Sequence, residues 1–217
     1  MKFFIDTANL DQITEAQNLG ILDGVTTNPS LMAKEGITGH SNIINHYEKI
    51  CEIVDGDVSA EVISTEFEGM VEEGTSLSKI SSQIVVKIPM TKNGVKALKY
   101  FSNNNIKTNC TLIFSPGQAL LAAKAGANYV SPFIGRLDDI SSDGLSLISE
   151  IRQIFDNYNF KTEILSASIR HNMHIIDCAK IGSDVVTTPL SSIIGLLNHP
   201  LTDSGLKKFL DDHEKGN

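Results

Sequence analysis

The sequence predicts a single α/β domain, a (β/α)8 TIM barrel with an additional helix at its C-terminal end. Short runs rich in β-branched residues alternate with longer amphipathic stretches along all 217 residues. Strands separated by helices pair in parallel through right-handed crossovers. The eight predicted strands, and a length near the lower end for barrels, favour closure over an open, doubly wound sheet.

The predicted strands are apolar or alternating runs bounded by turn residues. In order they are residues 3–6, 24–28, 58–63, 84–89, 108–114, 129–135, 162–168 and 184–189. An open nucleotide-binding sheet would carry a glycine-rich turn after its first strand, whereas residues 7–12, TANLDQ, contain no glycine. No segment rich in Pro, Gly or Ser divides the chain, so we expect residues 1–217 to form one domain.

The predicted helices carry apolar residues at steps of three and four, which places these residues on one face. Residues 144–158 show the pattern most clearly, with Leu147, Ile151 and Phe155 in register. The other helices are predicted at residues 10–19, 43–53, 69–80, 95–102, 116–125 and 173–181. Glycines that suit helix C-caps follow three of them, at Gly20, Gly126 and Gly182. Asn28-Pro29-Ser30 predicts a turn and a helix entry, with Ser30 as the N-cap.

The composition is that of a globular protein whose main partner is neither nucleic acid nor an anionic membrane. The net charge is −8 and the sequence pI is about 5.2, without a cluster of Lys and Arg. No stretch approaches the roughly 18 apolar residues that cross a bilayer. The three cysteines, Cys51, Cys110 and Cys178, are widely spaced and suggest no disulfide framework. With no signal peptide in MKFFIDTANL, we expect a soluble, cytoplasmic protein with reduced thiols.

Polar side chains recur at or near the end of every predicted strand, which is where barrel enzymes of this kind place their chemistry. They are Asp6, Asn28, Glu61, Lys87, Asn109, Thr111, Ser131, Arg136, Ser166, Ser168, Arg170, Thr187 and Thr188. For any single Ser or Thr, a polar strand end without function explains the position equally well. Charged residues inside a barrel need partners, so Asp6, Glu61 and Lys87 together form either a catalytic group or a structural ion network.

Lys87 stands in IVVKIP, residues 84–89, a run that otherwise reads as a buried strand. Side chains two apart on a strand share a face, so if Val86 and Ile88 pack under the helices, Lys87 points into the barrel. Desolvation disfavours the charged form of an amine, and a lysine facing an apolar-walled cavity therefore supplies a nucleophile that forms Schiff bases with carbonyl substrates. Asp6 and Glu61 would then move protons, and Thr111 would orient a water.

Arg136 and Arg170 follow neighbouring strands, and with Ser168 they suit a phosphate. The alternative is that these arginines are ordinary surface residues. His171 and His174 stand three apart, but no third ligand lies at metal-site spacing, so we interpret them as structural and expect no metal site.

At this level of detail the chain resembles the transaldolases, in particular the short subfamily shared with the fructose-6-phosphate aldolases. The motifs are FFIDTAN (3–9), GVTTNPSL (24–31), AEV (60–62), IVVKIP (84–89), TNCTLIFS (108–115), YVSPFIGR (129–136), SASIR (166–170) and TTPL (187–190). They follow in order along almost the whole chain. The resemblance implies a (β/α)8 barrel, sugar-phosphate substrates, no cofactor and no metal.

The resemblance also implies roles for individual residues. Lys87 matches the Schiff-base lysine, Asp6 the acid/base at the sugar hydroxyl next to the broken bond, and Glu61 with Thr111 the pair that holds the catalytic water. Residues matching those that contact the bound dihydroxyacetone portion are Asn28, Asn109 and Ser131. Residues matching the phosphate site are Arg136, Ser168 and Arg170.

Two positions separate the activities within the subfamily, since the aldolases carry Gln where Glu61 stands and Tyr where Phe133 stands. Here both positions have the transaldolase residue. The resemblance thus implies transfer of a dihydroxyacetone unit from sedoheptulose 7-phosphate to glyceraldehyde 3-phosphate, giving erythrose 4-phosphate and fructose 6-phosphate in the non-oxidative pentose phosphate pathway. The alternatives are a fructose-6-phosphate aldolase that releases free dihydroxyacetone, and a non-catalytic sugar-phosphate-binding barrel.

Residues 202–213 predict a short amphipathic helix, too short to persist unless it is docked. In the subfamily the C-terminal helix packs against a neighbouring subunit, so the resemblance implies a homo-oligomer, a decamer, in which this helix makes subunit contacts.

Overall fold

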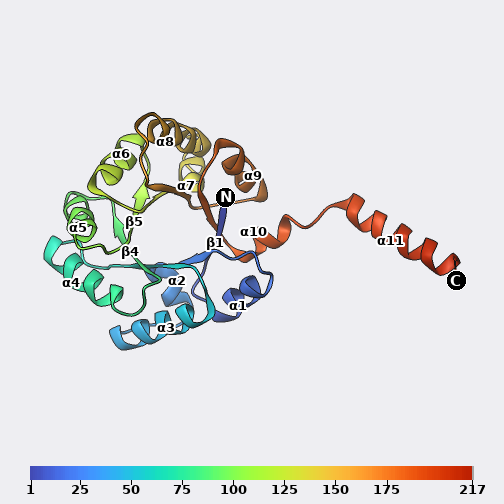
Figure 1. Cartoon of the computed structure of the whole chain (residues 1–217), viewed down its shortest axis with the longest axis horizontal. Helices are drawn as coiled ribbons and strands as arrows, with labels where there is room; N and C mark the ends of the chain where they lie inside the picture. Colours follow the sequence, from blue (N-terminus) through green and yellow to red (C-terminus); the bar gives the residue numbers. More distant parts are fainter. Residues whose placement is uncertain (217) are drawn as a thin grey trace.

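The computed structural model describes residues 1–216 and shows a closed barrel of eight parallel strands in sequence order, ringed by helices (Figure 1). The predicted fold class is confirmed. The strands are β1 (Lys2–Asp6), β2 (Gly24–Thr26), β3 (Asp57–Glu61), β4 (Ile84–Pro89), β5 (Thr108–Ile113), β6 (Tyr129–Pro132), β7 (Glu163–Ser166) and β8 (Val185–Thr188). Pairing of β1 with β8 completes the ring, so no strand edge is left open.

Most helices cover the outside of the barrel, and each predicted helix is present with slightly different ends. They are α1 (Leu10–Asn18), α2 (Pro29–Lys34), α3 (His40–Ile53), α4 (Phe67–Ser78), α5 (Lys92–Asn103), α6 (Pro116–Ala125), α7 (Ile134–Asp138), α8 (Gly144–Tyr158), α9 (Asn172–Ile181), α10 (Leu190–Gly195) and α11 (Pro200–Lys215). Gly126 and Gly182 cap α6 and α9 in the left-handed conformation, as predicted.

Alternation along the strands divides the core into two parts. Val86 and Ile88 are fully buried in the large cluster between strands and helices, as the sequence pattern indicates. A second, smaller cluster fills the inside of the barrel, with Phe4, Val85 and Leu165 among its members. Lys87 shares the inward face with Val85 but lies one pleat nearer the C-terminal end of β4.

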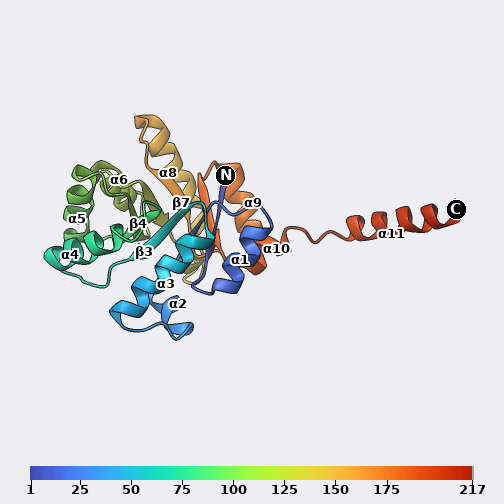
Figure 2. The ribbon, with the colours of Figure 1, turned by 60° about the horizontal axis from the view of Figure 1, so that its bottom comes forward.

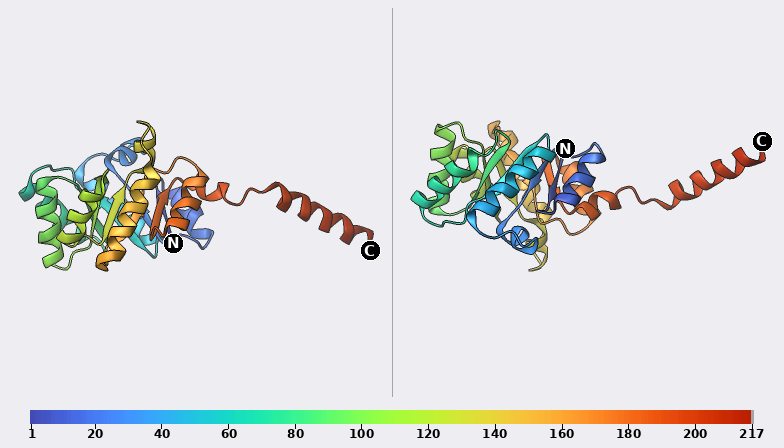
Figure 3. Two further views of the ribbon diagram at one scale, coloured as in Figure 1. Left: turned by 90° about the horizontal axis from the view of Figure 1, so that it is seen from above. Right: turned by 90° about the horizontal axis from the view of Figure 1, so that it is seen from below.

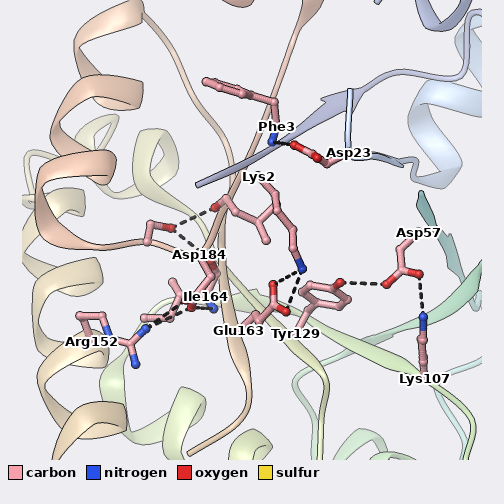
Figure 4. Close-up of polar contacts among 12 residues, drawn as sticks. Lys2, Phe3, Asp23, Asp57, Lys107, Tyr129, Arg152, Glu163, Ile164 and Asp184 are labelled. Atoms are coloured by element: carbon pink, nitrogen blue, oxygen red, sulfur yellow. Dashed lines mark hydrogen bonds and ion pairs between the residues drawn. The ribbon is translucent and has the colours of Figure 1, made fainter. Parts of the chain in front are cut away.

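The N-terminal end of the barrel is closed by a chain of polar contacts (Figure 4). The Lys2 Nζ atom lies 2.9 Å from both carboxylate oxygens of Glu163, and it approaches the Tyr129 ring. The Tyr129 hydroxyl donates to Asp57 over 2.8 Å, and Lys107 pairs with the same carboxylate. Since barrel chemistry sits at the opposite, C-terminal end, we interpret this network as part of the scaffold.

Two short helices, α7 and α10, were not predicted, and α2 was predicted only as a helix entry without an extent, because five or six residues give too little periodicity to detect. The prediction of Ser30 as the N-cap is wrong by two residues. Asn28 caps α2, since its Oδ1 atom accepts the Leu31 N–H over 3.0 Å, and Pro29 takes the first helical position. Phe133 and Ala167, predicted as strand, lie beyond the strands and pair only through an isolated β-bridge, residues 134–135 begin α7, and Ser168 lies in the following loop.

Helix α11 projects away from the barrel at the end of an extended connection (Figures 2 and 3). None of its residues is buried, and Leu201, Phe209 and Leu210 are 74%, 71% and 56% exposed. Within residues 1–216, no helix is long and apolar enough to cross a membrane.

Candidate active site

A cavity of two lobes opens at the C-terminal ends of the strands, and Lys87 lies where the lobes meet. One lobe has a volume of about 300 Å³ and is lined by Asp6, Thr26, Asn28, Lys87, Ser131, Phe133, Arg136, Ala167, Ser168, Ile169, Arg170, Thr187 and Pro189. The other has a volume of about 510 Å³ and is lined by Asn28, Pro29, Ser30, Leu31, Lys34, Glu61, Lys87, Thr111, Leu112, Phe133 and Arg136. The structure thus brings ten of the eleven predicted site residues to one cavity.

Asn109 is the exception, because it is fully buried behind the cavity wall. Its Nδ2 group donates to Ser59 Oγ over 3.2 Å, and its Oδ1 atom accepts the Ser131 hydroxyl over 2.7 Å. Asn109 therefore reaches the cavity through Ser131, which presents only its lone pairs to a ligand.

Lys87 is only 5% exposed, and two oxygens compensate its charge. The Nζ atom donates to the backbone carbonyl of Thr27 over 3.0 Å and lies 3.1 Å from Glu61 Oε2. Burying an ammonium without such partners would cost several kcal/mol, on the order of the ion-desolvation penalty. Glu61 is consequently the group placed to take a proton from the lysine.

The Thr27 carbonyl that receives Lys87 is itself anchored by the side chains around it. The Thr27 hydroxyl donates to Ser59 O over 3.1 Å, so the buried Tyr47 hydroxyl, 2.7 Å away, is the donor to Thr27. Desolvation raises the pKa of Tyr47 to about 12, which keeps this phenol protonated. Lys87 is thus held by a backbone segment that two side chains fix.

Asp6 stands in the first lobe at the end of a chain of two hydroxyls. Thr26 Oγ1 donates to Asp6 Oδ1 over 2.7 Å, and Thr187 Oγ1 lies 2.6 Å from Thr26 Oγ1. Because the single proton of Thr26 points to the carboxylate, Thr187 must donate to Thr26. The chain orients the Asp6 carboxylate from two neighbouring strands.

Thr111 faces the second lobe with a buried hydroxyl that has no hydrogen-bond partner within residues 1–216. Beside it, the register of β5 against β6 shifts between Cys110 and Ile113, and Leu112 has a φ of 60°. Such a left-handed conformation is costly for a branched residue and clusters at functional sites. The irregularity brings both Thr111 and Leu112 to the cavity.

Arg136, Ser168 and Arg170 line the first lobe together. The Arg136 guanidinium stacks over the Phe133 ring, 4.8 Å from its centroid. Arg170 pairs with Asp139, since their Nη2 and Oδ2 atoms are 2.6 Å apart. Two guanidinium groups in one lobe suit a phosphate-bearing ligand.

The cavity differs in one respect from the expectation of an apolar wall. The residues around Lys87 are mostly polar, because its apolar strand neighbours Val86 and Ile88 point outward to the helices. Thr187 was noted only as a polar strand end and Thr26 was missed, yet both line the site. The register that pairs Thr26 with Asp6 would have identified the place of Thr26. Ser30 was noted only as a helix cap and Lys34 was missed, because the extent of α2 was not predicted. No group of three His, Cys, Asp or Glu side chains in the described chain is arranged to hold a metal.

Comparison with known proteins shows similarity along nearly the whole chain. The family model described as Transaldolase/Fructose-6-phosphate aldolase matches residues 3–216. Proteins named "Probable transaldolase" from Flavobacterium psychrophilum and Cytophaga hutchinsonii are 70% and 69% identical over 217 residues, covering 100% of both chains. One of the same name from Bacteroides thetaiotaomicron is 64% identical over the same span.

The buried Tyr47 phenol makes stability depend on pH in the alkaline range. In the unfolded chain tyrosine ionises with its ordinary pKa of 10.0, whereas in the fold the pKa of Tyr47 is raised to about 12, so wild-type stability is lost as the pH rises between these values. Tyr47→Phe lacks the Thr27 hydrogen bond but also lacks this loss. We expect the difference in unfolding free energy between wild type and Tyr47→Phe to narrow from pH 9 to pH 12 in denaturant titrations. A constant difference would contradict this.

Proposed function

Because the chain belongs to the Transaldolase/Fructose-6-phosphate aldolase family, we propose that it is a transaldolase that transfers a dihydroxyacetone unit between sugar phosphates. The donor would be sedoheptulose 7-phosphate or fructose 6-phosphate and the acceptor an aldose phosphate, as in the non-oxidative pentose phosphate pathway of the cytoplasm. The shared name of the relatives supports this choice. The observation that carries it is the pairing of the buried Lys87 with Glu61 in a cavity where Phe133 has no hydroxyl.

The first chemical step would use the Lys87–Glu61 pair. Transfer of a proton from Nζ to Glu61 Oε2, 3.1 Å away, leaves a neutral amine that attacks the ketose carbonyl carbon. Loss of water from the carbinolamine gives a protonated imine. Glu61, with the unpartnered Thr111 hydroxyl, is placed to hold the water that leaves and later returns.

The bond-breaking step would use Asp6. The Asp6 carboxylate accepts the proton of the hydroxyl next to the scissile carbon–carbon bond. This bond then breaks, and the electron pair of the bond moves into the iminium to give an enamine. The aldose leaves as an aldehyde. The Thr187–Thr26 chain keeps Asp6 oriented for both this step and its reverse with the acceptor.

Phe133 would determine the fate of the enamine. A tyrosine at this position would offer a phenolic proton to the enamine carbon and free dihydroxyacetone would leave, which is the alternative, aldolase, activity. The phenyl ring offers no proton and lies under Arg136, so the enamine persists until an aldehyde arrives. The phosphate would be held by Arg136, Ser168 and Arg170. The dihydroxyacetone portion would be held by Asn28 and by Ser131, whose hydroxyl is oriented by Asn109.

The nucleophile can be tested directly by trapping. Borohydride reduction with fructose 6-phosphate should add the reduced dihydroxyacetone fragment to Lys87, as located by mass spectrometry of peptides. Lys87→Met should give no adduct and lower transfer by at least about 10³-fold, in line with loss of covalent catalysis. Lys107→Met, which removes a lysine at the opposite end of the barrel, is the control and should retain the adduct. Full activity in Lys87→Met would refute the mechanism.

Product analysis separates transferase from aldolase. With fructose 6-phosphate alone, wild type should release at most one equivalent of glyceraldehyde 3-phosphate, and continuous release should need erythrose 4-phosphate. Phe133→Tyr should add acceptor-independent release of dihydroxyacetone, because a phenol can protonate the enamine. Continuous wild-type release without acceptor would instead establish the aldolase activity.

We also propose that α11 makes subunit contacts in a homo-oligomer. Its Leu201, Phe209 and Leu210 are exposed and none of its residues is buried, although helices in proteins gain most of their stability from packing of an apolar face. A second copy of the chain is the occupant that is always available to cover it.

Truncation after Pro200 should therefore lower the number of subunits per particle, as measured by light scattering. The fold of the barrel, followed by circular dichroism, should be retained. Phe209→Asp should weaken the assembly in the full-length chain. An unchanged number of subunits in both variants would contradict a role of α11 in assembly.

A further inference from the structure

The loop that carries Ser168 and Arg170 is bound along its length to α7, the short helix that carries Arg136. The Ile134 N–H donates to Ala167 O over 3.0 Å, and the Gly135 N–H donates to Ser168 O over 2.9 Å. A side chain at Gly135 would collide with Ser168 O and with Arg170 Cγ and Nε, so the arginine stem lies against bare backbone. Ser168 has a φ of 60°, a strained conformation that this packing holds.

His174, in the first turn of α9, anchors the backbone of Arg170. The Arg170 N–H donates to His174 Nδ1 over 3.3 Å, and His174 Nε2 lies 3.1 Å from Asp138 Oδ2. A backbone amide can only donate, so Nδ1 carries no proton and Nε2 donates to the carboxylate. The ring is 6% exposed, and burial, followed by the charge of His171, lowers the pKa of His174 and favours this neutral form.

Asp138 is fixed on its other side. Its Oδ1 atom accepts the Gly144 N–H at the start of α8 over 3.0 Å, and Gly144 packs so closely on Ile134 that a Cβ would collide with the Ile134 backbone. The last residue of α7 is therefore tied to α8 and, through His174, to α9.

Asp139, the next residue, holds the other end of Arg170 through the 2.6 Å contact between Oδ2 and Nη2. One N–H of a guanidinium engaged in this way leaves its other donors for a ligand in the cavity. Backbone and guanidinium of Arg170 are thus held by adjacent residues of one short segment.

We propose that Asp138, Asp139 and His174 form a positioning unit, here called the α7 clamp, that fixes Arg170 for the terminal phosphate of the substrate and so sets the preference for phosphorylated over unphosphorylated aldehyde acceptors. The inference rests on the proposed transaldolase function. A guanidinium already held in place loses less conformational entropy when it binds an anion, which is the physical gain from the clamp. None of the three residues touches the reacting atoms.

The test compares erythrose 4-phosphate with erythrose as acceptors. In a ping-pong transfer the acceptor kcat/KM reports only its own half-reaction, so the phosphate on the donor does not enter. Asp139→Asn should lower kcat/KM for erythrose 4-phosphate roughly 5- to 10-fold more than for erythrose, the loss expected for one charge-assisted contact. The effect should fall mainly on KM.

His174 variants separate the bonds within the clamp. His174→Asn keeps an acceptor near the Nδ1 position but loses the contact with Asp138, whereas His174→Ala loses both. Preference for the phosphorylated acceptor should therefore decrease in the order wild type, Asn, Ala. Asp156→Asn is the matched control, since it removes an equally exposed aspartate paired with Arg152 over 2.7 Å on α8, and it should leave the preference unchanged.

Binding of inorganic phosphate to the free protein, followed by calorimetry, gives a readout that does not need transfer. Weaker binding in Asp139→Asn supports the clamp even if no transfer is found, in which case only the proposed function fails. Two results would overturn the clamp: an equal loss of kcat/KM for both acceptors in Asp139→Asn, or unchanged phosphate binding in that variant. The proposed function would survive either result if the wild type shows transaldolase activity. Because Asp139 is exposed, this variant decides the matter even if the buried His174 variants do not fold.

Discussion

The burial of the Lys87 ammonium is the constraint on which the rest of the site depends. An ammonium that is 5% exposed must be compensated, and the fold supplies the Thr27 carbonyl and the Glu61 carboxylate at 3.0 and 3.1 Å. Those two acceptors in turn fix neighbouring structure: Thr27 is anchored by Tyr47, and Glu61 lies opposite Lys87 in the register of β3 and β4. The same arrangement keeps a proton acceptor beside the amine, so in the proposed mechanism the group that stabilises the lysine would also take its proton.

The barrel separates its charges between its two ends, with an apolar layer between them. At the N-terminal end Lys2 pairs with Glu163 and Lys107 pairs with Asp57. Tyr129 lies between the two pairs, since its hydroxyl donates to Asp57 and Lys2 Nζ lies over its ring. At the C-terminal end the charged groups line a cavity and have partners that a substrate can share or replace. Phe4, Val85 and Leu165 fill the space between. Close packing of that layer lets the mouth hold strained residues such as Leu112 and Ser168 without loss of the fold.

The elements that obey a clear period were predictable from sequence, and those that do not were missed. IVVKIP predicted the bounds of β4 and the inward direction of Lys87, because a strand period of two leaves only one face for it. The motif TTNPS predicted a helix entry but not the extent of α2, since six residues are too few for a helix pattern, and it placed the cap at Ser30 instead of Asn28. Asn109 was expected at the surface of the cavity but lies behind Ser131. Strand alternation predicts which face a side chain takes, but not how deep in the barrel it lies. The contacts of Asp138, Asp139 and His174 join three separate elements, so no local pattern contained them.

Hydrogen-bond direction gives the cavity a polarity that a substrate must match. Ser131 donates its hydroxyl proton to Asn109, and Thr26 donates its proton to Asp6. Both hydroxyls can therefore only accept further hydrogen bonds, as the carboxylates of Asp6 and Glu61 do. Donors come from Lys87, from the unpartnered Thr111 hydroxyl and from the two arginines. A ligand with several hydroxyl donors along its chain, one carbonyl at the lysine and one anionic group at its end satisfies this sequence of partners. A phosphorylated ketose has that order of groups, whereas an apolar or cationic ligand would leave buried acceptors or the arginines uncompensated.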